Sequence, residues 1–279
     1  MKMNLLPKWL LLFCVLICFK LSANIPYKIP RSSVIELTEP ATNRVYPIFI
    51  VLPKSYKKQS NKVYPVIYLT DAPYTFPVVA GATRFPMNSG KMREAIIVAI
   101  GYEKGSTGSN SRIRDYTLTH AKSWRKQTGN AQGHIEFIKN TLFPFIENNY
   151  RASSSQKTYI GNSLGGLFGA TILFTMPDLF SNYIIGSPSV WFDNNALLAL
   201  KVDKPKLPIR VYISVGSMET PDFGEGQNMV EGAEQLTQKI NALKSDNIEL
   251  KSVVIGGANH ATAFPTTAIQ GLDWVLAAE

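Results

Sequence analysis

The sequence predicts an α/β domain in which a mostly parallel sheet is covered by helices on both faces. Short, continuous apolar runs recur along the chain, and such runs are typical of strands buried on both faces. Amphipathic stretches of helical length alternate with them, which favours parallel strands joined by helices. The apolar fraction of 45% and the charged fraction of 18% are those of a globular protein that can bury a sizeable core.

The predicted elements follow one another from residue 33 onward. Segments 33–37 and 45–52 are predicted to be antiparallel edge strands, and Pro47 supports an edge position because proline cannot donate a ladder hydrogen bond. The further strands expected are 66–70, 95–100, 157–160, 183–185, 211–215 and 250–255. The helices expected are 135–148, 164–174, 230–243 and 266–277. No change of composition marks a linker, so residues 24–279 are expected to form one domain.

Two long stretches, 101–133 and 187–208, lack a regular pattern. Loops of this length in a compact domain tend to be functional or disordered. Both leave the carboxyl ends of predicted strands, the edge at which open α/β sheets bind ligands. We therefore expect them to wall a substrate pocket, with Arg112, Arg114 and Trp191 as candidates for substrate contact. An ion pair within the protein is the alternative for each arginine.

Residues 1–23 have the pattern of a secretory signal peptide. Lys2 and Lys8 precede an apolar run, 9–19, and the small residue Ala23 ends the segment. The run is shorter than the roughly 20 apolar residues that a membrane span needs. We expect cleavage near Ala23 and a periplasmic or secreted protein that is free of the membrane afterwards. A lipoprotein modified at Cys18 is the alternative.

Charge and cysteine content exclude several function classes. The formal charge is +9, but three lysines lie in the leader and the other basic residues are spread along the chain. Nucleic-acid binding needs a dense basic stripe, which the sequence lacks. Both cysteines, Cys14 and Cys18, also lie in the leader. The mature chain therefore has no thiolate nucleophile, disulfide or cysteine metal site, and we expect no metal or organic cofactor.

The stretch Gly161-Asn162-Ser163-Leu164-Gly165 carries the clearest chemistry, since it joins a predicted strand to a predicted helix. Strand, G-x-S-x-G and helix together are typical of a nucleophile elbow, a sharp turn that exposes the serine hydroxyl. Glycines on either side leave room for the strand and helix. The helix that starts here directs its first N–H groups at the place where an oxyanion would form. We predict that Ser163 is a nucleophile; a glycine-rich turn with an incidental serine is the alternative.

A serine nucleophile needs a base and an acid. Of the chain's histidines, His120, His134 and His260, the last follows the final predicted strand, downstream of the serine, and is the predicted base. In hydrolases of this arrangement the acid lies between serine and histidine in the chain. Glu219, just after a predicted strand, is the predicted acid, and Asp222 is the alternative.

An oxyanion hole needs two backbone N–H groups. Leu164, the residue after the nucleophile, is expected to supply one of them. The other is expected from the loop after the third strand, where Pro73 has no N–H to give. Ala72 is therefore the predicted second donor, with Asp71 as the alternative.

Together these features resemble the esterase branch of the α/β-hydrolases, which includes enterobactin esterases, feruloyl esterases and S-formylglutathione hydrolase. The resemblance covers the chain from about residue 30 to its end and rests on segments 68–71, 112–116, 143–150, 161–166, 186–191, 216–219 and 256–260. Periplasmic siderophore-esterase-like members are the most similar, because they carry the Ser187-Pro188-Ser189-Val190-Trp191 pattern. The chain departs from many relatives at Asp71-Ala72, where they have Asp-Gly.

The resemblance implies an α/β-hydrolase fold, a Ser163-Glu219-His260 triad and an exported serine esterase that needs no cofactor. The implied substrate is a small-molecule carboxylic ester, with a siderophore lactone of the enterobactin type favoured by the basic balance of the chain. The alternatives are a feruloyl or acetyl-polysaccharide esterase, a general carboxylesterase and an acyltransferase with the same triad. A non-catalytic binding module on the same fold is the alternative from another class.

Overall fold

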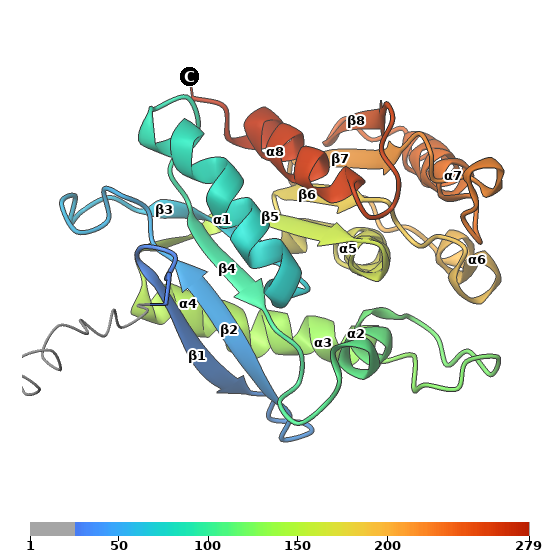
Figure 1. Cartoon of the computed structure of the whole chain (residues 1–279), viewed down its shortest axis with the longest axis horizontal. Helices are drawn as coiled ribbons and strands as arrows, with labels where there is room; N and C mark the ends of the chain where they lie inside the picture. Colours follow the sequence, from blue (N-terminus) through green and yellow to red (C-terminus); the bar gives the residue numbers. More distant parts are fainter. Residues whose placement is uncertain (1–25, 279) are drawn as a thin grey trace, which may run out of the picture.

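The computed structural model describes residues 26–278, at the centre of which lies an eight-stranded sheet in the order β1-β2-β4-β3-β5-β6-β7-β8 (Figure 1). β1 pairs with β2 and β2 with β4 in antiparallel fashion, and all other neighbours are parallel. The strands are β1 (Ser32–Thr38), β2 (Val45–Val51), β3 (Tyr64–Leu69), β4 (Ile96–Ile100), β5 (Ala152–Asn162), β6 (Asn182–Gly186), β7 (Ile209–Gly216) and β8 (Ile248–Ile255). The predicted mostly parallel sheet is confirmed.

One strand position differs from the prediction. β1 is an edge strand, but β2 lies between β1 and β4. Pro47 is tolerated inside the sheet because the pairing of β2 with β4 begins only at Ile48. The missing N–H of the proline therefore falls outside that ladder.

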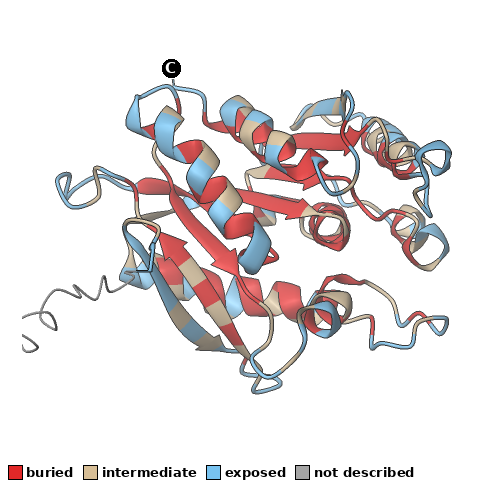
Figure 2. Ribbon diagram, in the orientation of Figure 1, coloured by how far each residue is buried: buried red, intermediate tan, exposed pale blue. Residues whose placement is uncertain are grey.

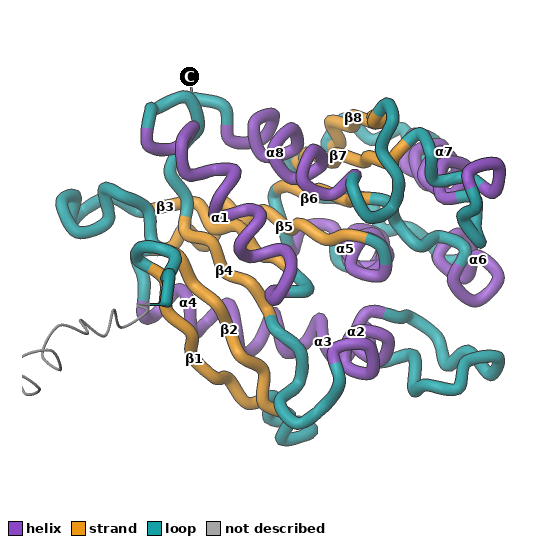
Figure 3. Tube along the Cα trace, in the orientation of Figure 1, coloured by secondary structure: helices purple, strands orange, loops and turns teal. Residues whose placement is uncertain are grey.

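Helices cover both faces of the sheet (Figure 3). One face carries α1 (Ala72–Asn88) and α8 (Ala263–Leu276), which pack against each other and on residues such as Ile97, Ile160 and Ile184. The other face carries α2 (Gly108–Tyr116), α3 (Ala131–Phe137), a π-helical turn (Ile138–Leu142), α4 (Phe143–Asn149), α5 (Leu164–Thr175), α6 (Phe192–Ala199) and α7 (Met229–Asn241). Two 3₁₀ turns, Pro177–Leu179 and Pro221–Phe223, complete the set. Figure 2 shows the central strands of the sheet and the inner sides of these helices as the buried part of the molecule, whereas the edge strand β1 is largely exposed.

Three helices lie where the sequence predicts none. α1 contains Pro73, Pro77 and Pro86, which hide its helical pattern, whereas α2 and α6 are short and lie within the two stretches predicted to be irregular. The predicted helices 164–174, 230–243 and 266–277 correspond to α5, α7 and α8. The predicted signal peptide, residues 1–23, lies outside the described residues. Within residues 26–278, no helix combines the length and the apolar character that a membrane crossing requires.

The topology brings the predicted site residues to one edge of the sheet. The parallel strands β3, β5, β6 and β7 end next to one another, so the segments that follow them lie side by side (Figure 1). These segments begin at Thr70, Ser163, Ser187 and Ser217, and β8 adds the turn that contains His260. The predicted nucleophile, base, acid and oxyanion donors all lie on this edge.

Candidate active site

Ser163 lies on the sharp turn between β5 and α5. Its backbone angles, φ 60° and ψ −119°, are unfavourable for a residue with a Cβ and mark a strained turn. The Ser163 N–H donates to the Gly186 carbonyl at 3.0 Å, which fastens the turn to β6. A Cβ on Gly161 would lie 2.3 Å from the Gly165 carbonyl oxygen, so only glycine fits there. This is the geometry of a nucleophile elbow.

Glu219 and His260 form a pair behind the elbow. The Glu219 side chain is fully buried, and its Oε2 lies 2.6 Å from His260 Nδ1. Because a carboxylate can only accept, Nδ1 carries the ring proton and Nε2 is left as the basic nitrogen. Ser187 Oγ donates to Glu219 Oε1 at 2.6 Å, and the Gly216 N–H donates to the same oxygen at 2.7 Å. The carboxylate is thus held in one orientation by three donors.

The two partners shift each other's ionisation. Burial would raise the pKa of Glu219, but the hydrogen bonds from His260, Ser187 and Gly216 outweigh it, and the pKa lies below its usual value. The hydrogen bond to Glu219 raises the pKa of His260 above its usual value, although partial burial acts in the opposite direction. Both shifts favour an ionised Glu219 beside His260, and a carboxylate in this position stabilises a protonated imidazole.

The hydroxyl of Ser163 is hydrogen-bonded to Ser189, with the two Oγ atoms 3.3 Å apart. Among residues 26–278, no hydrogen bond joins Ser163 to His260. In unliganded enzymes the bond between nucleophile and base is often long and tightens only with substrate. The structure thus brings Glu219 and His260 together and gives Ser163 a different resting partner.

Two helix N-termini meet beside the nucleophile. Leu164 is the first residue of α5, and Ala72 is the first residue of α1. The two turns are in close contact, because a Cβ on Gly165 would lie 2.5 Å from Thr70 Oγ1. The Asp71 N–H already donates to Tyr116 Oη at 3.2 Å, which favours Ala72 over Asp71 as the second oxyanion donor.

Arg112 is fixed at the same turn. Its Nε and Nη2 donate to the two carboxylate oxygens of Asp71 at 2.9 and 3.2 Å, and Tyr102 Oη donates to Asp71 Oδ1 at 2.9 Å. The side chain of Arg112 is 24% exposed. A bidentate ion pair of this kind orients the guanidinium and leaves Nη1 for a further acceptor. Arg112 is therefore both an ion-pair partner and a cation at the rim of the site.

Arg114, the second predicted substrate contact, lies in a buried network instead. Its guanidinium donates to Asp115, to Glu103 and to Tyr46 Oη. All three of its nitrogens are engaged, and the residue is 7% exposed. We correct the prediction of substrate contact for Arg114: it is a structural ion-pair partner.

Trp191, the third predicted substrate contact, is half-buried and stacks on Trp124 with ring centroids 6.2 Å apart and an interplanar angle of 17°. It lies two residues after Ser189, the partner of the nucleophile. The two stacked indoles come from segments distant in the sequence, the loop before α3 and the start of α6.

The remaining candidates lie apart from this cluster. Asp222, the alternative acid, is exposed on the turn Pro221–Phe223, and His120 is exposed in its loop. His134 is buried among Tyr46, Phe137 and Phe168. No group of three or more His, Cys, Asp or Glu residues is arranged to hold a metal ion in the part of the chain that the structure describes.

Sequence reasoning assigned no role to Ser187 or Ser189, although their stretch carried the resemblance. A usable signal existed. Both follow β6, the neighbour of β5, at the carboxyl ends of the parallel strands, which is the edge at which open α/β sheets bind ligands.

The fold and the elbow define a serine-type hydrolase of carboxylic esters on the α/β-hydrolase fold. The chain belongs to the esterase family, whose model, described as "Putative esterase", matches residues 40–272. It is 31% identical over 271 residues to the ferri-bacillibactin esterase BesA of Bacillus subtilis, covering 90% of this chain and 91% of BesA. The crystal structure of the BES protein from Bacillus cereus superimposes with a TM-score of 0.78 at 28% identity, over 91% of this chain and 97% of that one. The siderophore hydrolase EstB from Aspergillus nidulans shares the fold with a TM-score of 0.74 at 23% identity, over 91% and 97% of the two chains.

Proposed function

We propose that this chain is an exported esterase that hydrolyses the ester bonds of a siderophore, with Ser163 as nucleophile, His260 as base and Glu219 as the orienting acid. The observation that carries the proposal is the buried Glu219 carboxylate at 2.6 Å from His260 Nδ1, on the sheet edge that also holds the strained turn of Ser163. A serine without an oriented base is a poor nucleophile, and this pair supplies the oriented base.

In the proposed reaction, the Ser163 hydroxyl leaves Ser189 and attacks the ester carbonyl while His260 Nε2 takes its proton. The Leu164 and Ala72 N–H groups hold the oxyanion of the tetrahedral intermediate. As the intermediate collapses, His260 returns the proton to the leaving alcohol and an acyl-enzyme remains. Water, deprotonated by the same histidine, then releases the acid and restores Ser163.

The substrate class follows from the relatives and from the rim of the site. The curated relatives include a ferri-bacillibactin esterase and a siderophore triacetylfusarinine C esterase. Here the Arg112 guanidinium provides a fixed positive charge, and Trp191 with Trp124 provides an aromatic surface. Anionic aromatic groups, such as the catecholates of a siderophore, match both features.

A feruloyl or general carboxylesterase is the second candidate, since the aromatic surface of Trp191 would also accept a ferulate ring. Kinetics on p-nitrophenyl esters of increasing acyl length, a feruloyl ester and ferric and iron-free enterobactin would distinguish the two. The siderophore proposal expects the highest kcat/KM on enterobactin. A higher kcat/KM on the feruloyl or p-nitrophenyl esters would contradict it.

Ser163→Ala tests the nucleophile in the same assay. Removing the nucleophile of such a triad lowers the rate by several orders of magnitude, on the order of 10⁶ in kcat. Unchanged activity in this variant would refute the assigned role. Product analysis with an added acceptor alcohol separates hydrolysis from acyl transfer.

Export rests on the leader alone. Expression of the full chain in a bacterial host followed by N-terminal sequencing tests it, with a mature end near Asn24 expected outside the cytoplasm. A product that begins at Cys18 would show a lipoprotein, and an uncleaved intracellular product would contradict export.

A further inference from the structure

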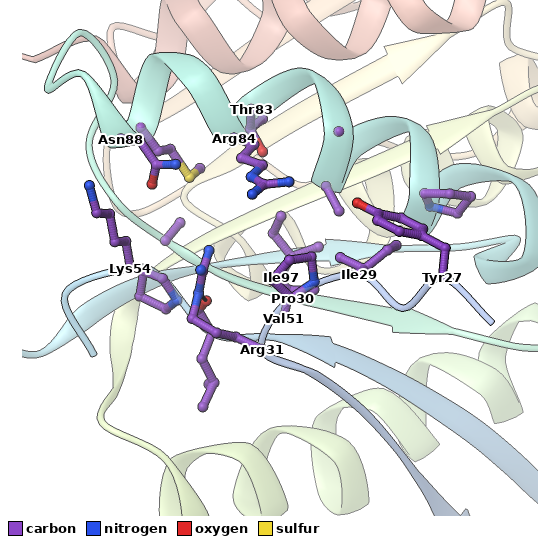
Figure 4. A pocket seen from close by; sticks show the side chains of 17 residues that line it. Tyr27, Ile29, Pro30, Arg31, Val51, Lys54, Thr83, Arg84, Asn88 and Ile97 are labelled. Carbon is purple, nitrogen blue, oxygen red and sulfur yellow. Dashed lines mark hydrogen bonds between the residues drawn. The ribbon is translucent and has the colours of Figure 1, made fainter. Parts of the chain in front are cut away.

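A cavity lies away from the candidate active site, between α1 and the chain that leads into β1. It has a volume of about 210 Å³. Its walls come from residues 27–31, from the end of β2 and the residues after it, and from the middle and end of α1 (Figure 4).

The floor of the cavity is apolar. It is formed by Val51, Ala80, Met87, Ala95 and Ile97, all of which are buried in the core between the sheet and α1. An apolar cavity of about 150 Å³ is large enough to bind benzene. The present cavity therefore has room for one aromatic ring or a medium-length alkyl chain.

The charged residues that line the cavity are all cationic: Arg31, Lys54 and Arg84. None of the three forms an ion pair with a carboxylate of residues 26–278. Figure 4 shows that they come from different segments, Arg84 from α1 and the other two from the facing chain. Three unpaired cations around one apolar opening favour an anionic group at its mouth.

The backbone and side-chain geometry of Arg31 also favours an anionic group at the mouth of the cavity. Its backbone is left-handed, with φ 65°, which is uncommon for a residue with a side chain. Its Nε donates to the Leu52 carbonyl at 2.8 Å. One edge of the guanidinium is thus fastened to the wall, while its two terminal nitrogens make no hydrogen bond to the described part of the protein. Strained residues of this kind concentrate where a side chain must be held for a ligand.

We infer that this cavity is a binding site for a small amphipathic carboxylate, with the apolar body on the floor and the carboxylate among Arg31, Lys54 and Arg84. The site is distinct from the active site. The active site lies at Ala72, the first residue of α1, whereas the helical residues of the cavity run from Pro77 to Asn88 at the other end. An α-helix rises about 1.5 Å per residue, so Gly81 lies roughly 13 Å along the axis from Ala72.

Gly81 provides a test that disturbs little else. A Cβ added to it meets no atom within 4 Å, and its backbone is helical, so a side chain there projects into open space at the cavity. Gly81→Phe should fill the opening, whereas Gly81→Ala is the matched control that adds only a methyl group. Both remove a glycine from a helix interior, a change that favours the helix.

Titration calorimetry with octanoate tests whether the cavity binds an amphipathic carboxylate. The same measurement with octanol shows how much the carboxylate charge contributes to binding. We expect octanoate to bind the wild-type chain and Gly81→Ala alike, and at least about tenfold more weakly to Gly81→Phe, because the ring excludes the alkyl chain. We expect octanol, which lacks the charge, to bind about twofold to fivefold more weakly than octanoate, in line with exposed ion pairs. A benzoate arm shows whether an aromatic or an alkyl body is preferred.

Arg84→Gln removes one of the positive charges at the cavity without altering Gly81. Lys201→Gln is the control for a general loss of positive charge, since Lys201 is exposed and does not line the cavity. We expect weaker octanoate binding for Arg84→Gln alone, with hydrolysis of p-nitrophenyl acetate unchanged in every variant. Octanoate binding that is equal in wild type, Gly81→Phe and Arg84→Gln would place the ligand elsewhere, such as at the product side of the active site, and would overturn the inference. An absence of octanoate and benzoate binding at millimolar concentration would also overturn it.

Discussion

Replacing Glu219 with glutamine isolates what the buried carboxylate does for His260. The carboxylate accepts from Ser187 and Gly216 through Oε1 and from His260 through Oε2. A glutamine side chain has the same shape but only one oxygen, so it cannot accept on both sides. Either its amide nitrogen faces the Gly216 N–H, or it faces His260 Nδ1.

The first orientation leaves the buried Gly216 N–H without an acceptor, which costs about 1–3 kcal/mol. The second orientation is therefore favoured by a factor of about 5 to 150. In that orientation the amide donates to His260 Nδ1, so the ring proton moves to Nε2, and the histidine can no longer take a proton from Ser163. The stabilising charge opposite the imidazolium is lost as well. We expect kcat to fall by roughly 10⁴, the loss caused by the corresponding change of aspartate to asparagine in a Ser-His-Asp triad.

The pH profile gives a second readout of the same substitution. Since the hydrogen bond to Glu219 raises the pKa of His260, the neutral base of the wild type is lost as pH falls through that raised value. The substitution removes the cause of the rise and leaves the burial, which lowers the pKa. The acid limb of the kcat/KM profile should therefore move to lower pH while the plateau falls.

The assay is kcat and kcat/KM for p-nitrophenyl acetate between pH 5 and 9, with circular dichroism to verify folding. Asp222→Asn is the matched control, because Asp222 is exposed on the next turn and should keep activity within about twofold. Glu219→Gln activity within tenfold of wild type, or an acid limb that does not move, would refute the reasoning. A large loss in Asp222→Asn instead would transfer the acid role to that residue.

Three further changes test other parts of the structure. Ser187→Ala removes a hydrogen-bond donor to the Glu219 carboxylate. It should lower kcat/KM by about tenfold, since a hydrogen bond to a charged group contributes about 1.5–3 kcal/mol. Initial rates measured across the pH range give this loss of kcat/KM. Gly165→Ala brings a Cβ to 2.5 Å from Thr70 Oγ1 and should reduce kcat by roughly 100-fold, because it displaces the turn of the proposed oxyanion hole. Gly226→Ala is the control, since a Cβ there meets open space and should leave kcat unchanged. Equal kcat values for the two variants would contradict the predicted steric clash. Burial lowers the pKa of His134, and its two ring nitrogens have no hydrogen-bond partner among residues 26–278, so stability should fall as pH drops below about 6.5, where the unfolded chain binds the proton more readily. His134→Phe should raise the free energy of urea unfolding by about 1–3 kcal/mol and flatten this pH dependence. A destabilised variant would contradict this expectation.

The fold was predictable where a strand or helix has one clear period. The apolar runs at β3, β4, β6 and β7 are buried along almost their whole length, so hydrophobicity alone locates them. α1 could not be found in this way. Pro73 lies in its first turn, where no N–H is needed, and the helix tolerates Pro77 and Pro86 because it packs on the sheet and on α8. Tertiary packing, which one sequence does not show, overrides the local preference here.

The site was predictable to the extent that chain order and strand ends determine it. Ser163, Glu219 and His260 could be placed on one edge of the sheet because each follows a predicted strand. The partners of Arg112 and Arg114 could not be chosen. The two arginines are two positions apart on α2 and so point in different directions, one toward Asp71 and the other toward Asp115 and Glu103. Only the packing of α2 decides which of them reaches the site.

The contacts of Asp71 account for the departure from the Asp-Gly pattern. Asp71 itself adopts the left-handed conformation, with φ 58°, and its N–H, its two carboxylate oxygens and its carbonyl are all bonded, to Tyr116, Arg112, Tyr102 and the first turn of α1. Because the residue in the left-handed conformation is Asp71, the next position needs no glycine, and Ala72 begins α1. The hydrogen bonds of Asp71 therefore hold the turn that places Ala72, the proposed second donor of the oxyanion hole, at the start of α1.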